Sequence, residues 1–92
     1  MEFEWDPAKA AVNLKKHGVS FEEATTAFLD PLAMSYLDPD HSVREQRVIT
    51  VGYSAIGRLL FVAHRDLGEE RVRIMSARVA TRKERREHEE GR

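Results

Sequence analysis

The pattern of hydrophobic and polar positions changes once along this chain, near residue 33. Before that point, apolar residues recur at helical spacing after a short opening strand at residues 2–5, where Phe3 and Trp5 face one way. From residue 33 to residue 79 the chain is rich in β-branched and aromatic residues, as is typical of strands. The pattern therefore predicts an α+β domain in which two helices precede the main sheet.

Capping residues define the two predicted helices. The first lies between Asp6-Pro7, which suit a cap and a first helical position, and Gly18, a residue that commonly follows a last turn. The second begins after Ser20, which forms a capping box with Glu23, and it ends before Asp30-Pro31.

Four strands follow, and the short loops between them favour an antiparallel meander. Leu59 to Ala63 is apolar without alternation, which is typical of a central strand buried on both faces. The two helices would cover one face of the sheet, and a partner, a second copy or the C-terminal segment would cover the other. The predicted strands are residues 33–37, 46–53, 58–65 and 71–79.

The chain ends in a predicted helix that begins with a capping box of Thr81 and Glu84. This helix has no apolar stripe, so little is gained by packing it on a core. It is either exposed and stabilised by pairs such as Glu84 with His88 and Arg85 with Glu89, or it is reserved for a ligand.

Length and composition restrict the possible classes of protein. Ninety-two residues predict a single domain, 1–92, with one core. The chain has no cysteine, which excludes disulfides and thiolate sites and favours a reducing, cytoplasmic setting. Its four histidines lack metal-ligand spacing, so neither a metal nor another cofactor is expected. No apolar stretch approaches the ~18 residues of a membrane span, which predicts neither a signal peptide nor a membrane segment.

Charge is distributed unevenly along the chain. Residues 71–92 carry eight of the fifteen Lys and Arg residues and have a net charge of +4, whereas residues 1–70 have a net charge of −5. Local potential governs encounters between charged molecules more than net charge does. The basic end therefore predicts a surface that attracts phosphate groups or an acidic partner.

Residues 76–86, Ser-Ala-Arg-Val-Ala-Thr-Arg-Lys-Glu-Arg-Arg, resemble the BrnT-type toxins of bacterial toxin–antitoxin modules, small ribonucleases with a fold similar to that of the RelE toxins. Two positions depart from that family, which usually carries a basic residue at Val79 and commonly a tyrosine at His88. The resemblance covers nearly the whole chain, and its other segments are Phe3–Asp6, Asn13–Ala24, Phe28–Pro31, Glu45–Arg47, Gly52 and Arg58 onward.

This resemblance implies metal-independent RNA cleavage that inhibits translation and growth. It also implies neutralisation by a BrnA-like antitoxin, with operator DNA bound only through the toxin–antitoxin complex, and a dimer or a heterotetramer as the assembly. Two alternatives remain open. The chain could be a non-catalytic binding module that docks an antitoxin and co-represses its operon, or a structural domain that dimerises through its open sheet face.

Five residues are candidates for catalysis. Arg78 closes the last strand and Arg82 opens the last helix, where both guanidinium groups and the helix N-terminus would clamp a phosphate. His17 is a candidate acid or base because an imidazole can give or take a proton near neutral pH, or it only complements the helix dipole. Glu84 is a base or only a capping residue, and His88 is a proton shuttle or a solvated side chain.

Other cations are candidates for RNA binding, and sheet alternation guides the interpretation of one of them. Arg73 should lie on the face opposite Val72 and Ile74, together with Met75 and Ala77. His64 is expected at a strand end. Other expectations are His41 in a loop, an Arg47–Glu45 pair and Arg58 beside a turn. The RNA-binding candidates are Arg73, Arg65, Lys16, Lys83, Arg85 and Arg86.

Overall fold

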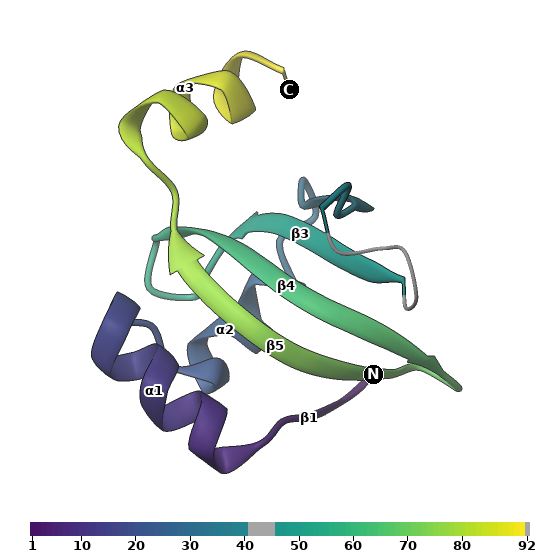
Figure 1. Ribbon diagram of the computed structural model, residues 1–92. Coiled ribbons are helices and arrows are strands. Elements are labelled where there is room, and N and C mark those ends of the chain that lie inside the picture. Colours follow the sequence, from purple (N-terminus) through teal and green to yellow (C-terminus); the bar gives the residue numbers. More distant parts are fainter. Residues whose placement is uncertain (41–45, 92) are drawn as a thin grey trace.

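A five-stranded sheet in the order β1-β5-β4-β3-β2 forms the framework of the protein (Figure 1). The computed structural model describes residues 1–40 and 46–91, so the predictions for His41 and Glu45 lie outside the described residues. The elements are β1 (Glu2–Glu4), α1 (Pro7–His17), α2 (Phe21–Ala27), β2 (Met34–Leu37), β3 (Arg47–Tyr53), β4 (Leu59–Gly68), β5 (Arg71–Val79) and α3 (Arg82–Glu90).

The predicted antiparallel meander is confirmed for β2 to β5, but the sheet is mixed. β1 adds a fifth strand that runs parallel to β5 and pairs only with Arg71–Arg73. The prediction of a mainly four-stranded antiparallel sheet is therefore wrong at this edge, because residue periodicity does not encode strand direction. Beyond Arg73, α1 packs beside this edge of β5 in place of a paired strand.

The predicted caps form, and one of them differs in detail. The Asp6 side chain accepts the Ala8 N–H at the start of α1, and Gly18 ends that helix in the left-handed conformation with φ 69°. The Ser20 side chain caps α2 by accepting the Glu23 N–H, but the reciprocal bond from the Ser20 N–H to the Glu23 side chain is not formed. Its carboxylate instead binds the Arg58 guanidinium, so Arg58 is a structural ion-pair partner as well as a residue beside a turn.

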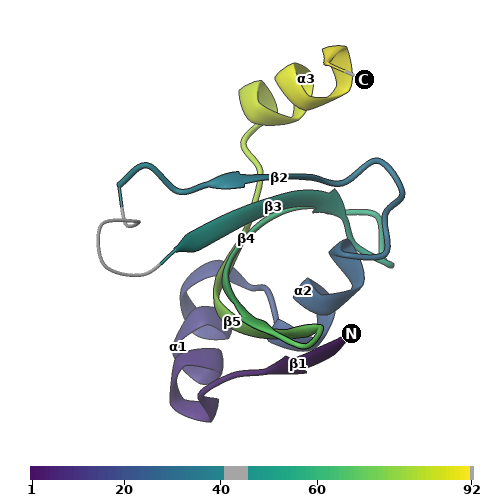
Figure 2. The same cartoon turned by 90° about the vertical axis from the view of Figure 1, so that its right-hand side faces the viewer.

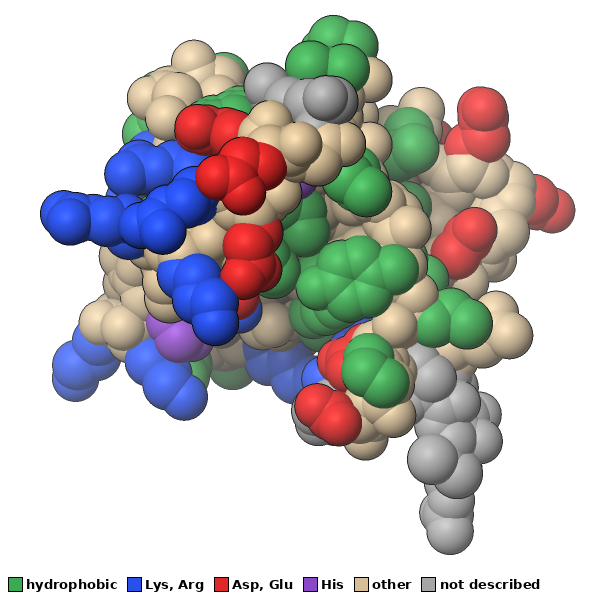
Figure 3. Space-filling model, turned by 90° about the horizontal axis from the view of Figure 1, so that it is seen from above, with side chains coloured by type: hydrophobic (Ala, Val, Ile, Leu, Met, Phe, Trp, Pro, Cys, Tyr) green, Lys and Arg blue, Asp and Glu red, His purple; other side chains and the backbone are tan. Residues whose placement is uncertain are grey.

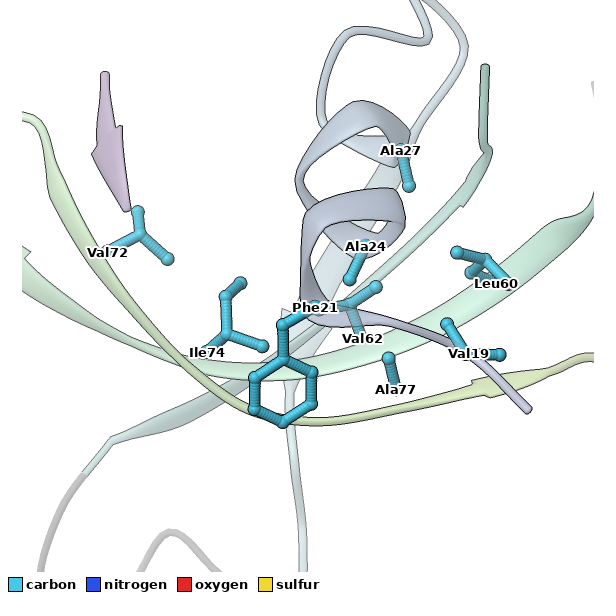
Figure 4. Close-up of a cluster of buried hydrophobic side chains, with 9 residues drawn as sticks. All are labelled: Val19, Phe21, Ala24, Ala27, Leu60, Val62, Val72, Ile74 and Ala77. Carbon is cyan, nitrogen blue, oxygen red and sulfur yellow. The ribbon is translucent and has the colours of Figure 1, made fainter. Parts of the chain in front are cut away.

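The core lies between α2 and the concave face of the curved sheet (Figure 2). Phe21, Leu60 and Ile74 are fully buried, and Trp5 packs edge-on against Phe21 with ring centroids 5.9 Å apart. β4 occupies the centre of the sheet, as predicted. The buried cluster consists of Val19, Phe21, Ala24, Ala27, Leu60, Val62, Val72, Ile74 and Ala77 (Figure 4).

A β-bulge interrupts the alternation of β5. Ser76 pairs with Ala63 whereas Ile74 pairs with the next residue of β4, which leaves Met75 as an extra residue. Ile74 and Ala77 consequently both belong to the core. The expectation that Ala77 shares a face with Arg73 is therefore wrong, and Arg78 points to the face opposite the helices, hereafter the open face.

His64 is buried within β4, so its predicted place at a strand end is wrong. Its Nε2 lies 2.7 Å from Thr50 Oγ1, which in turn lies 2.7 Å from Ser35 Oγ. The ring of Phe28 packs edge-on against the imidazole at 4.8 Å. Burial lowers the pKa of His64 from 6.5 to about 4, because the charged form loses hydration.

α3 extends past the end of β5 and lies over one end of the open face (Figures 1 and 2). The predicted capping box of Thr81 and Glu84 is present, and most of the helix is exposed. His88 is the exception, at 8% exposure, because its ring packs edge-on against Tyr53 at 6.3 Å. The Tyr53 hydroxyl also donates a hydrogen bond of 2.6 Å to Glu89. Within the described residues, no helix is long and apolar enough to cross a membrane.

Candidate active site

A cavity of about 360 Å³, here called the Arg78 cavity, lies on the open face where β5 ends. Its walls come from the middle of the sheet, the last turn of α1, the turn after β2 and the first turn of α3. The lining residues are His17, Tyr36, Asp38, Pro39, Asp40, Ile49, Phe61, Ala63, Ser76, Ala77, Arg78 and Glu84.

Arg78 is held in this cavity by two neighbours. Its Nη1 and Nη2 each donate a hydrogen bond of 2.8 Å to a different oxygen of Glu84. Its guanidinium carbon lies 4.6 Å from the ring centroid of Phe61, which is a cation–π distance. The guanidinium group therefore has one fixed orientation over the open face.

The same ion pair determines the chemistry of Glu84. Its bonds to Arg78 lower the pKa of Glu84 to about 2, and the backbone N–H of Thr81 contributes further. The pKa of Arg78 is raised by the same bonds. A carboxylate with so low a pKa is a weak proton acceptor near neutral pH, so the geometry favours a positioning and capping role for Glu84 over a role as base.

His17 reaches the cavity because Asn13 fixes α1 against the edge of β5. The buried Asn13 amide donates to Ala77 O at 2.8 Å, and its carbonyl oxygen accepts from Ala77 N at 3.0 Å. A third bond, at 3.0 Å, runs to Val19 O. Asn13 thus pairs with β5 as a neighbouring strand would, and it places the last turn of α1 beside Arg78.

Two predicted catalytic residues lie elsewhere. Arg82 is exposed at the start of α3 and does not line the Arg78 cavity, so the predicted clamp of two arginines is not formed there. His88 lines a different cavity of about 430 Å³ under α3, which it shares with Tyr36, Phe61 and Glu84. Neither residue is brought together with His17.

Sequence reasoning missed four polar residues of the Arg78 cavity: Tyr36, Asp38, Asp40 and Ser76. Burial and the nearby Glu84 raise the pKa of the Tyr36 hydroxyl, which therefore stays protonated. The alternation of side chains along β2 was the sequence signal that was available for placing Tyr36. The two aspartates leave three carboxylates and one guanidinium in the lining, and acidic side chains border the basic ones on the face drawn in Figure 3.

The comparison with protein families agrees with this architecture. The family model described as the ribonuclease toxin BrnT of type II toxin–antitoxin systems matches residues 5–84. The chain belongs to the BrnT family. The crystal structure of the Brucella abortus ribonuclease toxin BrnT is similar in fold, with a TM-score of 0.70 and 21% sequence identity over 89% of this chain and 99% of that one. No curated protein sequence matches the chain.

The predicted RNA-binding cations of this BrnT-family chain are dispersed. Arg73 donates to Glu4 at 2.8 Å and lies opposite Arg65. Lys83 lies 4.0 Å from Glu87, whereas Arg85 and Arg86 are exposed on α3. Lys and Arg side chains gather along one side of the face in Figure 3, with a histidine among them.

Lys16 directly precedes His17, which lines the Arg78 cavity, in the last turn of α1. It lines a separate groove along α1 that His17 and Ser76 also line. Among the described residues, no group of three or more His, Cys, Asp or Glu side chains could hold a metal ion.

Proposed function

We propose that this BrnT-family chain is an endoribonuclease that cleaves RNA at the Arg78 cavity without a metal ion. One observation supports this proposal above the others: α1, β5 and α3 bring His17, Arg78 and Glu84 around one cavity. Cleavage of RNA would inhibit translation and growth while the site is open.

The chemistry needs three things of the protein. The 2′-oxygen of the RNA forms a bond to the adjacent phosphorus, and the bond from phosphorus to the 5′-oxygen breaks. The 2′-oxygen loses its proton to solvent or protein, and the 5′-oxygen gains a proton. Extra negative charge on the phosphoryl oxygens must also be stabilised. His17 suits the proton transfers and Arg78 suits the charge.

Glu84 would hold Arg78 in position and leave it when phosphate arrives. A phosphate oxygen pair accepts the same two N–H bonds that the carboxylate now accepts. Because the lining carries three carboxylates, RNA entry also requires Asp38 and Asp40 to be compensated by cations at the rim. The basic residues of α1 and α3 serve that purpose in this proposal.

Cleavage of a single-stranded RNA by purified protein, with a chelator present, tests the function. Arg78→Ala and His17→Ala should each lower cleavage at least about a hundredfold, because each removes a group that acts on the reacting phosphate. Arg71→Ala is the matched control, since Arg71 pairs with Glu4 at the far end of β5. Fragments should end in a 2′,3′-cyclic phosphate. Full activity in Arg78→Ala, or activity lost with the chelator, would contradict the proposal.

The second candidate is a non-catalytic module that docks a DNA-binding antitoxin, and the carboxylate on Arg78 favours it. In that case pure protein leaves RNA intact at every concentration. In either case we propose that a cognate antitoxin of the BrnA type covers the open face and the basic side chains beside it. Operator DNA would be bound through that complex, as a dimer or a heterotetramer, and the fold would be related to that of RelE toxins.

A further inference from the structure

A groove of about 400 Å³ runs along α1 beside the free edge of β5, hereafter the α1 groove. It exists because β1 pairs with only the first residues of β5, so α1 lies along the remaining edge. Val12 and the bulged Met75 contribute its apolar surface, and Val12 is 65% exposed. His17 and Ser76 line both this groove and the Arg78 cavity, so the two are neighbours.

The charge of the α1 groove is opposite to that of the Arg78 cavity. Lys9 and Lys16 lie two helical turns apart on its rim, and its lining, all within the described residues, includes no carboxylate. The Arg78 cavity, by contrast, contains Asp38, Asp40 and Glu84. An anionic chain that enters the cavity is therefore attracted from the side of α1.

We propose that the α1 groove is the subsite for the nucleotide next to the scissile phosphate, with its base on Val12 and Met75 and its outer phosphate on Lys9 or Lys16. This rests on the proposed function of the Arg78 cavity. A base offers a flat apolar face and a strand offers a phosphate at each nucleotide, and that combination matches an apolar surface flanked by cations. Because the surface has aliphatic groups, the subsite accepts bases by shape and contact.

Two variants on the same helix test the subsite by cleavage of an RNA oligonucleotide. Val12→Glu puts a carboxylate where the base would lie, and we expect KM to rise about tenfold or more, the loss that removing one base contact produces, with kcat nearly unchanged. Leu14→Glu is the matched control, because Leu14 is also exposed on α1 but lines neither cavity. Circular dichroism of both variants checks folding. If Val12→Glu and Leu14→Glu have the same KM as wild type, the subsite is refuted while the proposed function stands.

Binding of the four nucleoside 3′-monophosphates, compared with inorganic phosphate, decides the question independently of cleavage. At least one nucleotide should bind about tenfold more tightly than phosphate and shift the methyl NMR signals of Val12 and Met75. If none of the four does either, the groove is not a base subsite. Wild-type protein that binds nucleotides in this way and leaves RNA intact would refute the proposed function but keep the subsite.

Discussion

Lowering the pH should destabilise this protein through one buried histidine. His64 lies at 6% exposure with its Nε2 bonded to Thr50, and its Nδ1 is buried without a hydrogen-bond partner among the described residues. In the unfolded chain the imidazole takes up a proton near pH 6.5, whereas in the folded protein its pKa is lowered to about 4. The contribution of neutral His64 to the free energy of unfolding is therefore fully present above pH 6.5 and is lost as the pH falls from there to about 4.

The size of the effect follows from the difference between the two pKa values. Each unit of that difference corresponds to about 1.4 kcal/mol, so protonation of His64 removes about 3 kcal/mol of the free energy of unfolding by pH 4. Below that pH the contribution stays constant, since both states then carry the proton. A loss of this size is a large part of the stability of a small domain.

Urea unfolding of wild type and His64→Gln between pH 7 and pH 4.5 measures the effect. Trp5 is the single tryptophan of the chain and packs against Phe21, so its fluorescence follows the core. The stability advantage of wild type over the variant should shrink by about 2–3 kcal/mol across this range, because all other titrating groups are common to both proteins. If the two proteins lose stability in parallel, the reasoning about His64 is wrong.

Three further outcomes can be measured. Asn13→Ala should lower the free energy of unfolding by roughly 2–4 kcal/mol, because it leaves Ala77 and Val19 backbone groups without their partner, and urea unfolding would show it. Gly52→Ala should cost roughly 1–3 kcal/mol in the same assay, since the new Cβ would lie 2.5 Å from the Ala27 carbonyl oxygen; an unchanged midpoint would contradict either estimate. RNA affinity should fall about twentyfold for a fourfold rise in salt if about three phosphates are contacted, and a flat salt profile would count against the cationic site.

Most of the fold could be predicted from the sequence because its signals are local. Capping residues marked the helices, and β-branched runs with short loops gave the meander. β1 could not be assigned a direction, because alternation of Phe3 and Trp5 is the same in a parallel and an antiparallel strand. The register of β5 could not be predicted either, since nothing in the sequence of residues 71–79 indicates a bulge.

The candidate site was predicted in part for the same reason. His17, Glu84 and Arg78 were singled out by residue type, and the structure brings them to one cavity. Strict alternation places Arg78 on the same face as Ile74, against the helices, so the sequence offered no correct route to its position. Asp38 and Asp40 depend on how the turn after β2 folds back over the sheet, which is a tertiary property.

The extra residue in β5 decides on which side of the sheet Arg78 lies, and the chemistry of the cavity depends on that position. If β5 kept the same residues but alternated without the bulge, every residue after Met75 would change sides, so that the guanidinium of Arg78 would be directed into the apolar interior and Ala77 outward. Two homologous chains with the same arginine could thus differ in whether it meets solvent at all. A sequence alignment of such chains that places a gap one position away from the bulge in β5 would therefore pair residues that lie on opposite sides of the sheet.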